Sequence, residues 1–402
     1  MNKKICVIGL GYIGLPTAAL LANRGYDVHG VDVVQSTVET INRGEIHIVE
    51  PELDTFVQAA VQSKKLQADL KPTQADVFII AVPTPFHEGY VPNVDYVVSA
   101  TKAIAPYVKE GNIVILESTS PVGTTDKVEE VLQECGVDTS RLYVAHCPER
   151  VLPGHIMREL VENDRIVGGT TPEATQKTAE FYRTFVEGEV LLTTAKTAEM
   201  AKLTENSFRD VNIAFANELS MLCDTFDINV WELIQLANRH PRVNILQPGA
   251  GVGGHCIAVD PWFIVHAAKD TQTEAKIIRT AREVNTYKTE WVIEKIKNEA
   301  LKFEVENGKK AKVACMGLAF KPDIDDLRES PALYITQRLI ADGLDVLAVE
   351  PNIESYKEFE IVEYTQALEK ADIVVFLVAH KEFKELETNK KLDFCGVLQN
   401  KG

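Results

Sequence analysis

The chain has 402 residues, of which 45% are hydrophobic, and its formal net charge is −17. A chain of this length and composition folds into two or three domains with substantial cores. The acidic balance argues against nucleic acid or an anionic membrane as a partner, although a local cluster of Arg and Lys could bind a small anion. The seven cysteines form no C-x-x-C pair, which indicates no disulfide or metal framework and a cytoplasmic protein with reduced thiols.

The first forty residues have the pattern of a nucleotide-binding βαβ unit. An apolar strand at 4–8 leads into Gly9, Gly11 and Gly14, which are followed by an apolar helix and a second strand ending at Asp32. The glycines allow a tight turn and close approach of the backbone to a pyrophosphate, which the helix N-terminus would bind. Asp32 would bind the ribose hydroxyls, and because no Arg or Lys closely follows it, NAD is favoured over NADP.

The same N-terminal segment also resembles a signal peptide, because the basic start at 2–4 precedes an uncharged run to Ala22. The spaced glycines interrupt that run, and a strand, turn and helix explain these residues better. No other uncharged apolar run approaches the length of a membrane helix.

Three apolar segments in the N-terminal third predict buried strands: 77–82, 113–116 and 143–146. Thr84, Thr119 and Glu149 lie in the loops that follow these strands. Ligands bind beyond the carboxyl ends of the strands in open parallel sheets, so we expect these three residues at one crevice.

The middle of the chain is predicted to be helical. Residues 197–226 contain no Pro or Gly and carry apolar residues at helical spacing, which predicts one long helix. Further helical patterns follow at 231–238 and 275–300. Lys202, Asn206 and Arg209 share one face of the long helix. Two interpretations stay open for this face: a solvated charged stripe, or a functional surface, which the poor helix former Asn206 favours.

A glycine-rich segment at 249–254 leads to Cys256. Its glycines let the backbone approach a ligand closely, and a thiol presented by such a loop is a candidate nucleophile. Asp260 could act as an acid or base beside the sulfur. The alternative is that Cys256 is a buried small hydrophobe, as most free cysteines are.

The C-terminal third weakly repeats the first. Segments 312–318, 343–350 and 371–376 resemble the strands near residues 5, 26 and 77 in that order. The repeat lacks the second and third glycines, so we expect it to keep the fold without the dinucleotide site. A charged loop at 320–331 could close over a phosphate or nucleotide. The predicted fold is α/β, with two Rossmann-like doubly wound parallel-sheet domains joined by a central helical segment with one long helix.

Seven motifs together resemble the UDP-glucose/GDP-mannose dehydrogenase family, over residues 2 to about 395. They are the fingerprint at Gly9, V-P-T-P at Val82, S-T-x-P-V-G-T-T at Ser118, P-E-R at Pro148, K-x-x-x-N at Lys202, G-V-G-G-H-C at Gly251 and F-K-P-D-x-D-D-x-R-x-S at Phe320. The resemblance implies an NAD-binding domain at 1–192, a helical dimerisation and substrate domain at 193–300, and a UDP-sugar-binding domain at 301–402. It also implies a homodimer built through the long helix.

Within this family the chain departs from the UDP-glucose branch, which typically has Lys where this chain has Val259. Segments 150–154, 239–245 and 256–262 instead resemble the branch that oxidises C6 of UDP-N-acetyl-D-mannosamine to a carboxylate with two NAD, for surface polysaccharide synthesis in bacteria. A dehydrogenase of UDP-N-acetylglucosamine, UDP-glucose or GDP-mannose is the nearest alternative. A single-step hydroxyacid dehydrogenase would need no cysteine nucleophile, and a non-catalytic NAD sensor would not keep one.

The resemblance assigns roles to individual residues. The catalytic set comprises the nucleophile Cys256, the oxyanion-stabilising Lys202 and Asn206, and Asp260, Glu149 and Thr119 near the hydrolytic water. The cofactor set comprises Gly9, Gly11, Tyr12, Ile13, Gly14, Asp32, Val82, Thr84, Thr119 and Arg328. The set for the UDP-hexosamine substrate comprises Arg150, Val151, Lys202, Asn206, Arg209, His240, Arg242, Gly253, Phe320 and Lys321. No metal is expected.

Overall fold

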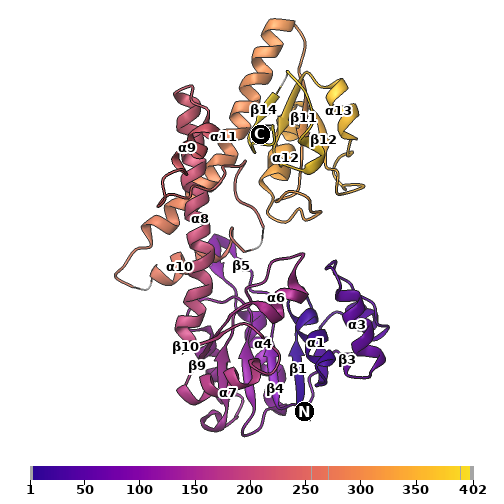
Figure 1. Cartoon of the computed structure of the whole chain (residues 1–402), viewed down its shortest axis with the longest axis vertical. Coiled ribbons are helices and arrows are strands. Elements are labelled where there is room, and N and C mark those ends of the chain that lie inside the picture. The colour runs from indigo at the N-terminus through magenta and orange to yellow at the C-terminus, as the bar shows by residue number, and fades with distance from the viewer. Residues whose placement is uncertain (1–2, 255, 270, 390, 399–402) are drawn as a thin grey trace. The chain divides into compact units, whose positions relative to one another are not determined.

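The computed structural model describes residues 3–254, 256–269, 271–389 and 391–398, and the chain divides into two compact units (Figure 1). Unit 1 comprises residues 1–204 with 269–271, and unit 2 comprises 205–268 with 272–402. Each unit contains its own parallel-dominated sheet. Within the described ranges, no helix combines the length and the apolar character that crossing a membrane requires.

The sheet of unit 1 has eight strands in the order β10-β9-β8-β7-β4-β1-β2-β3. The strands are β1 (Lys4–Ile8), β2 (Asp27–Val31), β3 (Leu66–Asp69), β4 (Val77–Ile80), β7 (Ile113–Leu116), β8 (Tyr143–His146), β9 (Arg165–Gly169) and β10 (Val190–Thr194). All neighbours pair in parallel except β8 and β9, which are antiparallel. A short hairpin of β5 (Phe86–His87) and β6 (Val91–Pro92) lies outside this sheet.

Helices cover both faces of this sheet, which explains the continuous apolar runs of its central strands. In β1, Ile5 and Val7 belong to one core and Cys6 and Ile8 to another, so both faces are buried. The first core includes α1 (Gly14–Asn23), α2 (Gln35–Asn42), α3 (Leu53–Gln62), α6 (Ile156–Glu162) and α7 (Pro172–Tyr182). The second includes α4 (Asp95–Ile104) and α5 (Thr124–Glu134). Short 3-10 turns lie at Glu88–Tyr90, Ala105–Tyr107 and Thr139–Arg141.

The long helix α8 (Ala195–Thr225) begins in unit 1 and continues into unit 2. The other helices of unit 2 are α9 (Val230–Ala237), α10 (Asp260–Lys269), α11 (Lys276–Asn307), α12 (Pro331–Ala341) and α13 (Tyr364–Lys370), with a 3-10 turn at Lys381–Phe383. Its sheet is parallel and ordered β12-β11-β13-β14, from β11 (Lys312–Met316), β12 (Asp345–Val349), β13 (Ile373–Phe376) and β14 (Lys391–Asp393).

In unit 2, α8 lies beside α11 (Figure 1), and buried polar side chains join the two helices. Arg282 and Asn285 of α11 donate to Asp210 of α8 at 2.7 and 2.8 Å, and Asn217 of α8 donates to Asn285 at 2.8 Å. Asn217 Oδ1 also accepts the N–H of Gly249 at 2.9 Å, so this polar ladder reaches the glycine-rich segment.

The predicted fold class is confirmed by the two Rossmann-like sheets and the long central helix, which was predicted at 197–226 and spans 195–225. The helix predicted at 275–300 is as long, because α11 extends from 276 to 307. The sequence did not indicate β9 or the antiparallel β8–β9 pair. Two glycines end β9, and a Cβ at Gly168 would lie 2.2 Å from the carbonyl oxygen of Thr194. Glycine is therefore required by close backbone packing in a strand whose composition does not favour β-structure.

Candidate active site

The turn after β1 has the shape that a dinucleotide requires, at the point of the sheet where the strand order reverses. Gly9 has φ +90°, and a Cβ there would lie 2.6 Å from the carbonyl oxygen of Ala81 and 3.2 Å from Val82 Cγ1. A Cβ at Gly14 would overlap the carbonyl oxygen of Gly9 at 1.8 Å, whereas one at Gly11 would meet nothing within 4 Å. Gly9 and Gly14 are thus fixed by packing, while Gly11 borders open space.

Asp32 at the end of β2 holds this turn. Its Oδ2 accepts the N–H of Leu10 and its Oδ1 the N–H of Val34, both at 3.0 Å. Tyr12 and Ile13 occupy the turn before α1, and in the described structure Ile13 provides no side-chain cap for that helix. An open glycine, an uncapped helix N-terminus and an acid after β2 together fit the pyrophosphate and ribose of NAD.

The loops after β4 and β7 are joined by side-chain hydrogen bonds. Thr84 Oγ1 donates to the carbonyl oxygen of Thr119 at 2.5 Å, and Ser118 Oγ donates to that of Val82 at 2.7 Å. The structure therefore brings Thr84, Thr119 and Val82 together at the carboxyl edge of the sheet. Their contacts with a cofactor stay a prediction.

Glu149, in the loop after β8, is buried and has both oxygens engaged. Arg165 Nη1 of β9 donates to its Oε2 at 2.7 Å, and the N–H of Arg150 donates to its Oε1 at 2.7 Å. Arg150 Nη1 donates to the carbonyl oxygen of Asp164 at 3.2 Å, and Val151 packs against the core. The loop that carries these three predicted residues is thereby held against β9.

A second buried carboxyl group of this cluster, Glu117, was missed by the sequence analysis. Tyr182 Oη donates to Glu117 Oε1 at 2.6 Å. Burial and the nearby charge of Glu149 raise the pKa of Glu117 to about 7, against the opposing effect of Arg165. Its position directly before the motif at Ser118 was a usable signal, but nothing in the sequence indicated Arg165 or Tyr182.

Asn206, Cys256 and Asp260, here called the thiol cluster, lie together in unit 2. Asn206 Nδ2 of α8 donates to Asp260 Oδ2 at 2.5 Å, and Asp260 is 3% exposed. The N–H of Asp260 donates to the carbonyl oxygen of Cys256 at 2.8 Å, closing the turn that begins α10. Cys256 is half-buried. On α8, Lys202 precedes Asn206 by one helical turn.

The glycine-rich segment packs on the loop at 320–331. A Cβ at Gly253 would lie 2.5 Å from the carbonyl oxygen of Glu329 and 2.8 Å from Phe320 Cβ. Gly254 has φ +81° and donates its N–H to the carbonyl oxygen of Arg328 at 3.2 Å. We expected these glycines to allow the approach of a ligand. That reason is incomplete, because contacts within the protein already require glycine at both positions.

Two cationic residues of the same loop differ in their surroundings. The Arg328 guanidinium lies against Asp326, with Nη2 to Oδ2 at 2.6 Å and Nε to Oδ1 at 3.0 Å. Lys321 is exposed and follows Phe320, whose N–H donates to the carbonyl oxygen of Asp326 at 3.1 Å. The structure thus brings Gly253, Phe320 and Arg328 together, and leaves the roles of Arg328 and Lys321 as predictions.

Arg209 on α8 and the pair His240 and Arg242 after α9 are exposed. The N–H of Arg242 lies 3.3 Å from His240 Nδ1, and Asn238 brackets this turn by hydrogen bonds of 3.0 and 2.7 Å with the backbone of Ile245. Asn238 was not singled out from the sequence. The roles of these three cationic residues in substrate binding stay predictions.

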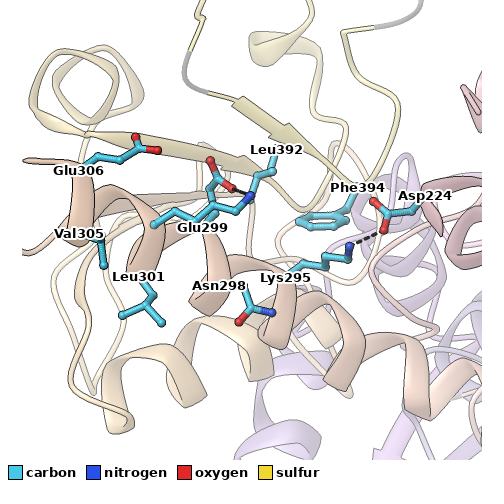
Figure 2. Close-up of a pocket in the computed structure, with 10 residues that line it drawn as sticks. Asp224, Lys295, Asn298, Glu299, Leu301, Val305, Glu306, Leu392 and Phe394 are labelled. Carbon is cyan, nitrogen blue, oxygen red and sulfur yellow. Dashed lines mark hydrogen bonds and ion pairs between the residues drawn. The ribbon is translucent and has the colours of Figure 1, made fainter. Parts of the chain in front are cut away.

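A cavity of about 730 Å³ opens beside α11 in unit 2 (Figure 2). Its lining residues are Asp224, Lys295, Asn298, Glu299, Leu301, Lys302, Val305, Glu306, Leu392 and Phe394. Lys295 and Asp224 form an ion pair at its wall. The sequence-predicted site residues are absent from this lining, so we assign no catalytic role to the cavity.

Three successive parts of the chain match the three domains of one protein family. Residues 3–186 match the NAD binding domain of the UDP-glucose/GDP-mannose dehydrogenase family, 196–287 its central domain and 314–398 its UDP binding domain. The first match contains the glycine turn and Asp32, and the second contains the thiol cluster.

Individual relatives match over nearly their whole lengths. The UDP-N-acetyl-D-mannosamine dehydrogenase of Campylobacter jejuni is 56% identical, covering 98% of this chain and 100% of that protein. The NDP-N-acetyl-D-galactosaminuronic acid dehydrogenase of Ralstonia solanacearum is 54% identical, covering 96% and 93%. The solved UDP-D-ManNAc dehydrogenase of Pyrococcus horikoshii superposes with a TM-score of 0.89 at 38% identity, covering 99% and 96%.

The sequence motifs, the NAD-compatible turn and these full-length matches agree. The resemblance inferred from the sequence is therefore confirmed, as is NAD as the cofactor. The chain belongs to the UDP-glucose/GDP-mannose dehydrogenase family and is an NAD-dependent nucleotide-sugar dehydrogenase.

Proposed function

We propose that the chain oxidises C6 of UDP-N-acetyl-D-mannosamine to a carboxylate, giving UDP-N-acetyl-D-mannosaminuronate for surface polysaccharide synthesis. The observation that carries this proposal is the thiol cluster, in which Asn206 and Asp260 hydrogen bond and Asp260 closes the turn from Cys256. A thiol in the turn that leads to a carboxylate bonded by an amide suits an oxidation that passes through a covalent thioester.

The reaction has two oxidative steps and one hydrolysis. Bound NAD supplies the hydride acceptor for each oxidation, and the turn at Gly9–Gly14 with Asp32 would hold it. The alcohol first loses a hydride and a proton to become an aldehyde. Cys256 Sγ then forms a bond to the aldehyde carbon while a proton passes to the aldehyde oxygen, giving a thiohemiacetal. That carbon loses a second hydride and its hydroxyl group loses a proton, which gives a thioester. Water adds to the thioester carbon, and the C–S bond breaks to release the acid and the thiol.

Neighbouring residues have separate tasks in these steps. Asn206 gives one N–H to Asp260 and has a second that can donate to the oxyanion at C6. Lys202, one turn earlier on the same helix, would share that task and accept the proton of the alcohol. Asp260, Glu149 and Thr119 would act near the hydrolytic water.

Substrate binding is assigned to cationic and hydrogen-bonding side chains of both units. Arg150, Arg209, His240, Arg242 and Lys321 would bind the UDP-sugar dianion, since guanidinium groups match phosphate oxygens bidentately. Val151, Gly253 and Phe320 would shape the sugar pocket, and Arg328 would reach the cofactor. The match of residues 314–398 to a UDP binding domain supports this assignment. We retain domains 1–192, 193–300 and 301–402 as the functional division, which the three family matches support.

We also propose a homodimer through α8. Phe208, Phe215 and Leu222 recur every seven residues on this helix and are 71%, 54% and 47% exposed. Residues seven apart lie on one helical face, and a second copy of the same stripe would cover such an apolar face.

One alternative substrate has a specific observation in its favour. The relative named for N-acetyl-D-galactosaminuronic acid is 54% identical to this chain, nearly as close as the 56% relative named for N-acetyl-D-mannosamine. Overall identity therefore does not separate these hexosamines, and UDP-N-acetylgalactosamine joins UDP-N-acetylglucosamine, UDP-glucose and GDP-mannose as a comparison substrate.

NADH release with each of these five nucleotide sugars tests the proposal. We expect about two NADH per UDP-N-acetyl-D-mannosamine and little from the other four, because both oxidations occur on one carbon. Cys256→Ser should abolish formation of the acid while NAD still binds. Cys135→Ser, at an exposed cysteine outside the cluster, is the matched control and should keep full activity.

The outcomes separate the parts of the proposal. One NADH per sugar, or unchanged acid formation by Cys256→Ser, would refute the thioester route. Preferential turnover of another sugar would keep the chemistry and overturn the substrate.

A further inference from the structure

A buried imidazole outside the assigned residues lies at the end of the second sheet. His380, shortly after β13, has no exposed surface. Its Nε2 lies 3.0 Å from Glu350 Oε2, while Nδ1 accepts the N–H of Asp323 at 3.0 Å and lies 3.1 Å from Asn352 Nδ2. Both ring nitrogens are therefore engaged, and each faces a different part of the chain.

The partners determine the tautomer. Asn352 Nδ2 also donates to Glu350 Oε1 at 3.0 Å, which fixes the amide with its N–H groups toward both neighbours. Nδ1 thus faces two N–H donors and acts as an acceptor, so Nε2 carries the hydrogen and donates it to Glu350. In this tautomer one ring nitrogen accepts and the other donates a hydrogen bond.

Glu350 is the anchor of this arrangement. Its Oε2 accepts the N–H groups of Leu318 and Ala319 at 2.8 and 2.9 Å, in addition to His380. Burial opposes ionisation of Glu350, but the hydrogen bonds from His380 and from the backbone N–H groups of Leu318 and Ala319 outweigh it and lower the pKa of Glu350 below its ordinary value. The carboxylate is therefore charged at neutral pH and joins the start of the loop, extended here to 318–331 by Leu318 and Ala319, to His380.

His380 holds the middle of the same loop. Asp323 has φ +61°, in the left-handed region that non-glycine residues rarely adopt, and its N–H is the one that Nδ1 accepts. The N–H of Lys381 donates back to Asp323 Oδ1 at 2.9 Å. These two bonds stabilise an uncommon backbone conformation that the loop sequence alone would not favour.

The other side of the loop supports the glycine-rich segment. Phe320, Arg328 and Glu329 are the residues against which Gly253 and Gly254 pack. A continuous path of contacts therefore runs within unit 2 from Glu350 and His380, through the loop, to the segment that ends at Cys256.

We propose that His380 is a positioning residue for sugar oxidation. With Glu350 it clamps Asp323 and sets the 318–331 loop, which places Phe320 and Lys321 for the UDP-sugar and supports the segment that presents Cys256. The inference rests on the proposed function for the role of this loop.

Two substitutions separate the two contacts of the ring. His380→Gln can place its amide nitrogen where Nε2 is and keep the bond to Glu350, but loses the acceptor for Asp323. His380→Asn can place its amide oxygen where Nδ1 is and keep the Asp323 bond, but leaves Glu350 without its partner.

We expect His380→Gln to raise the KM for the UDP-sugar about tenfold or more, because small misplacements of binding groups are costly. His380→Asn should lower the melting temperature more and the affinity less. The KM for NAD should stay within about twofold in both.

Binding of UDP and alkylation of Cys256 make the test independent of turnover. Calorimetric titration with UDP should show weaker binding to His380→Gln, and iodoacetamide should modify Cys256 at a changed rate, with the exposed Cys135 as internal reference. If the wild-type protein does not oxidise UDP-N-acetyl-D-mannosamine, the proposed function fails while these two measurements still decide the role of His380.

The proposal would be overturned if His380→Gln bound UDP as tightly as the wild type and Cys256 were alkylated at the same rate. It would also be overturned if both variants lost melting temperature equally while the KM for the UDP-sugar stayed the same. Should His380→Gln not fold, hydrogen exchange of the Asp323 amide in the wild-type protein decides. Strong protection supports the clamp, and exchange as fast as in exposed loops overturns it.

Discussion

Two buried carboxyl groups of unit 1, Glu117 and Glu149, are neutralised in different ways. Glu149 forms an ion pair with Arg165, whose side chain is itself buried. Glu117 is hydrogen bonded to the neutral hydroxyl of Tyr182, and its pKa is raised to about 7. Two neighbouring carboxylates cannot both ionise cheaply in a buried site, so burial and the charge of Glu149 raise the pKa of Glu117.

This difference predicts how stability changes with pH. Between its ordinary pKa of 4.5 and about 7, native Glu117 binds a proton that the unfolded chain does not. The contribution of this proton to the free energy of unfolding is complete below pH 4.5. It is lost as the pH rises to 7, and the loss is roughly 3 kcal/mol over that range. Glu117→Gln stays neutral, so its melting temperature relative to the wild type should rise between pH 5 and 8. Thermal melting of both proteins between pH 5 and 8 measures this difference.

The exposed Glu187 provides the matched control, because Glu187→Gln should melt in parallel with the wild type at every pH. A constant difference between Glu117→Gln and the wild type would show that Glu117 is already ionised in the folded protein.

At the scale of elements, the α8–α11 contact is specified by polar groups rather than by apolar packing alone. Burial raises the pKa of Asp210, against the effect of Arg282, and the 2.7 Å ion pair compensates a charge on each helix. Lys288 of α11 donates to Ser220 of α8 at 2.7 Å, and burial lowers the pKa of Lys288 to about 7. A shift of either helix by one turn would leave these groups buried and unpaired, so the ladder fixes one register.

Asp210→Asn removes the negative partner of a buried arginine. We expect a loss of about 3 kcal/mol or more in stability, because an uncompensated buried charge remains. The control is Asp126→Asn, which breaks the exposed pair with Lys196 and should cost about 1 kcal/mol or less. Denaturant unfolding of both variants measures the difference. Equal losses would mean that the buried pair contributes no more than an exposed one.

At the scale of the whole molecule, the heptad-spaced stripe on α8 predicts the state of assembly. Sedimentation of the wild-type protein should give a mass of about twice the 44.6 kDa of one chain. The double variant Phe208→Asp, Phe215→Asp places charges on that face and should give single chains. Val33→Asp, at a residue 91% exposed in unit 1, controls for charge alone and should remain a dimer. A single-chain mass for the wild type would refute the α8 dimer.

The sequence predicted the fold well because its signals are local. Apolar runs, the glycine spacing at 9–14 and the helical pattern at 197–226 each lie in one continuous stretch of the chain. The buried clusters could not be predicted in this way, because they join distant residues. Glu117 meets Tyr182 across 65 positions, and Asp323 meets His380 across 57.

The candidate site shows the same division. Cys256 and Asp260 could be predicted together because only three residues lie between them, whereas the bond from Asn206 could not be predicted because it spans 54 positions. The requirement for Gly253 depends on Phe320 and Glu329, which only the folded chain brings to it.

Asp32 and Glu350 occupy corresponding places in the two sheets. Each directly follows the second strand of its unit, accepts an N–H from the loop after the first strand, and accepts another from the residue two positions on. Both oxygens of Glu350 accept hydrogen bonds within unit 2, Oε1 from Asn352 and Oε2 from His380. The acid that is expected to bind a cofactor in unit 1 is therefore a structural contact in unit 2, and a loss of the His380 side chain would free one oxygen of Glu350 for another donor.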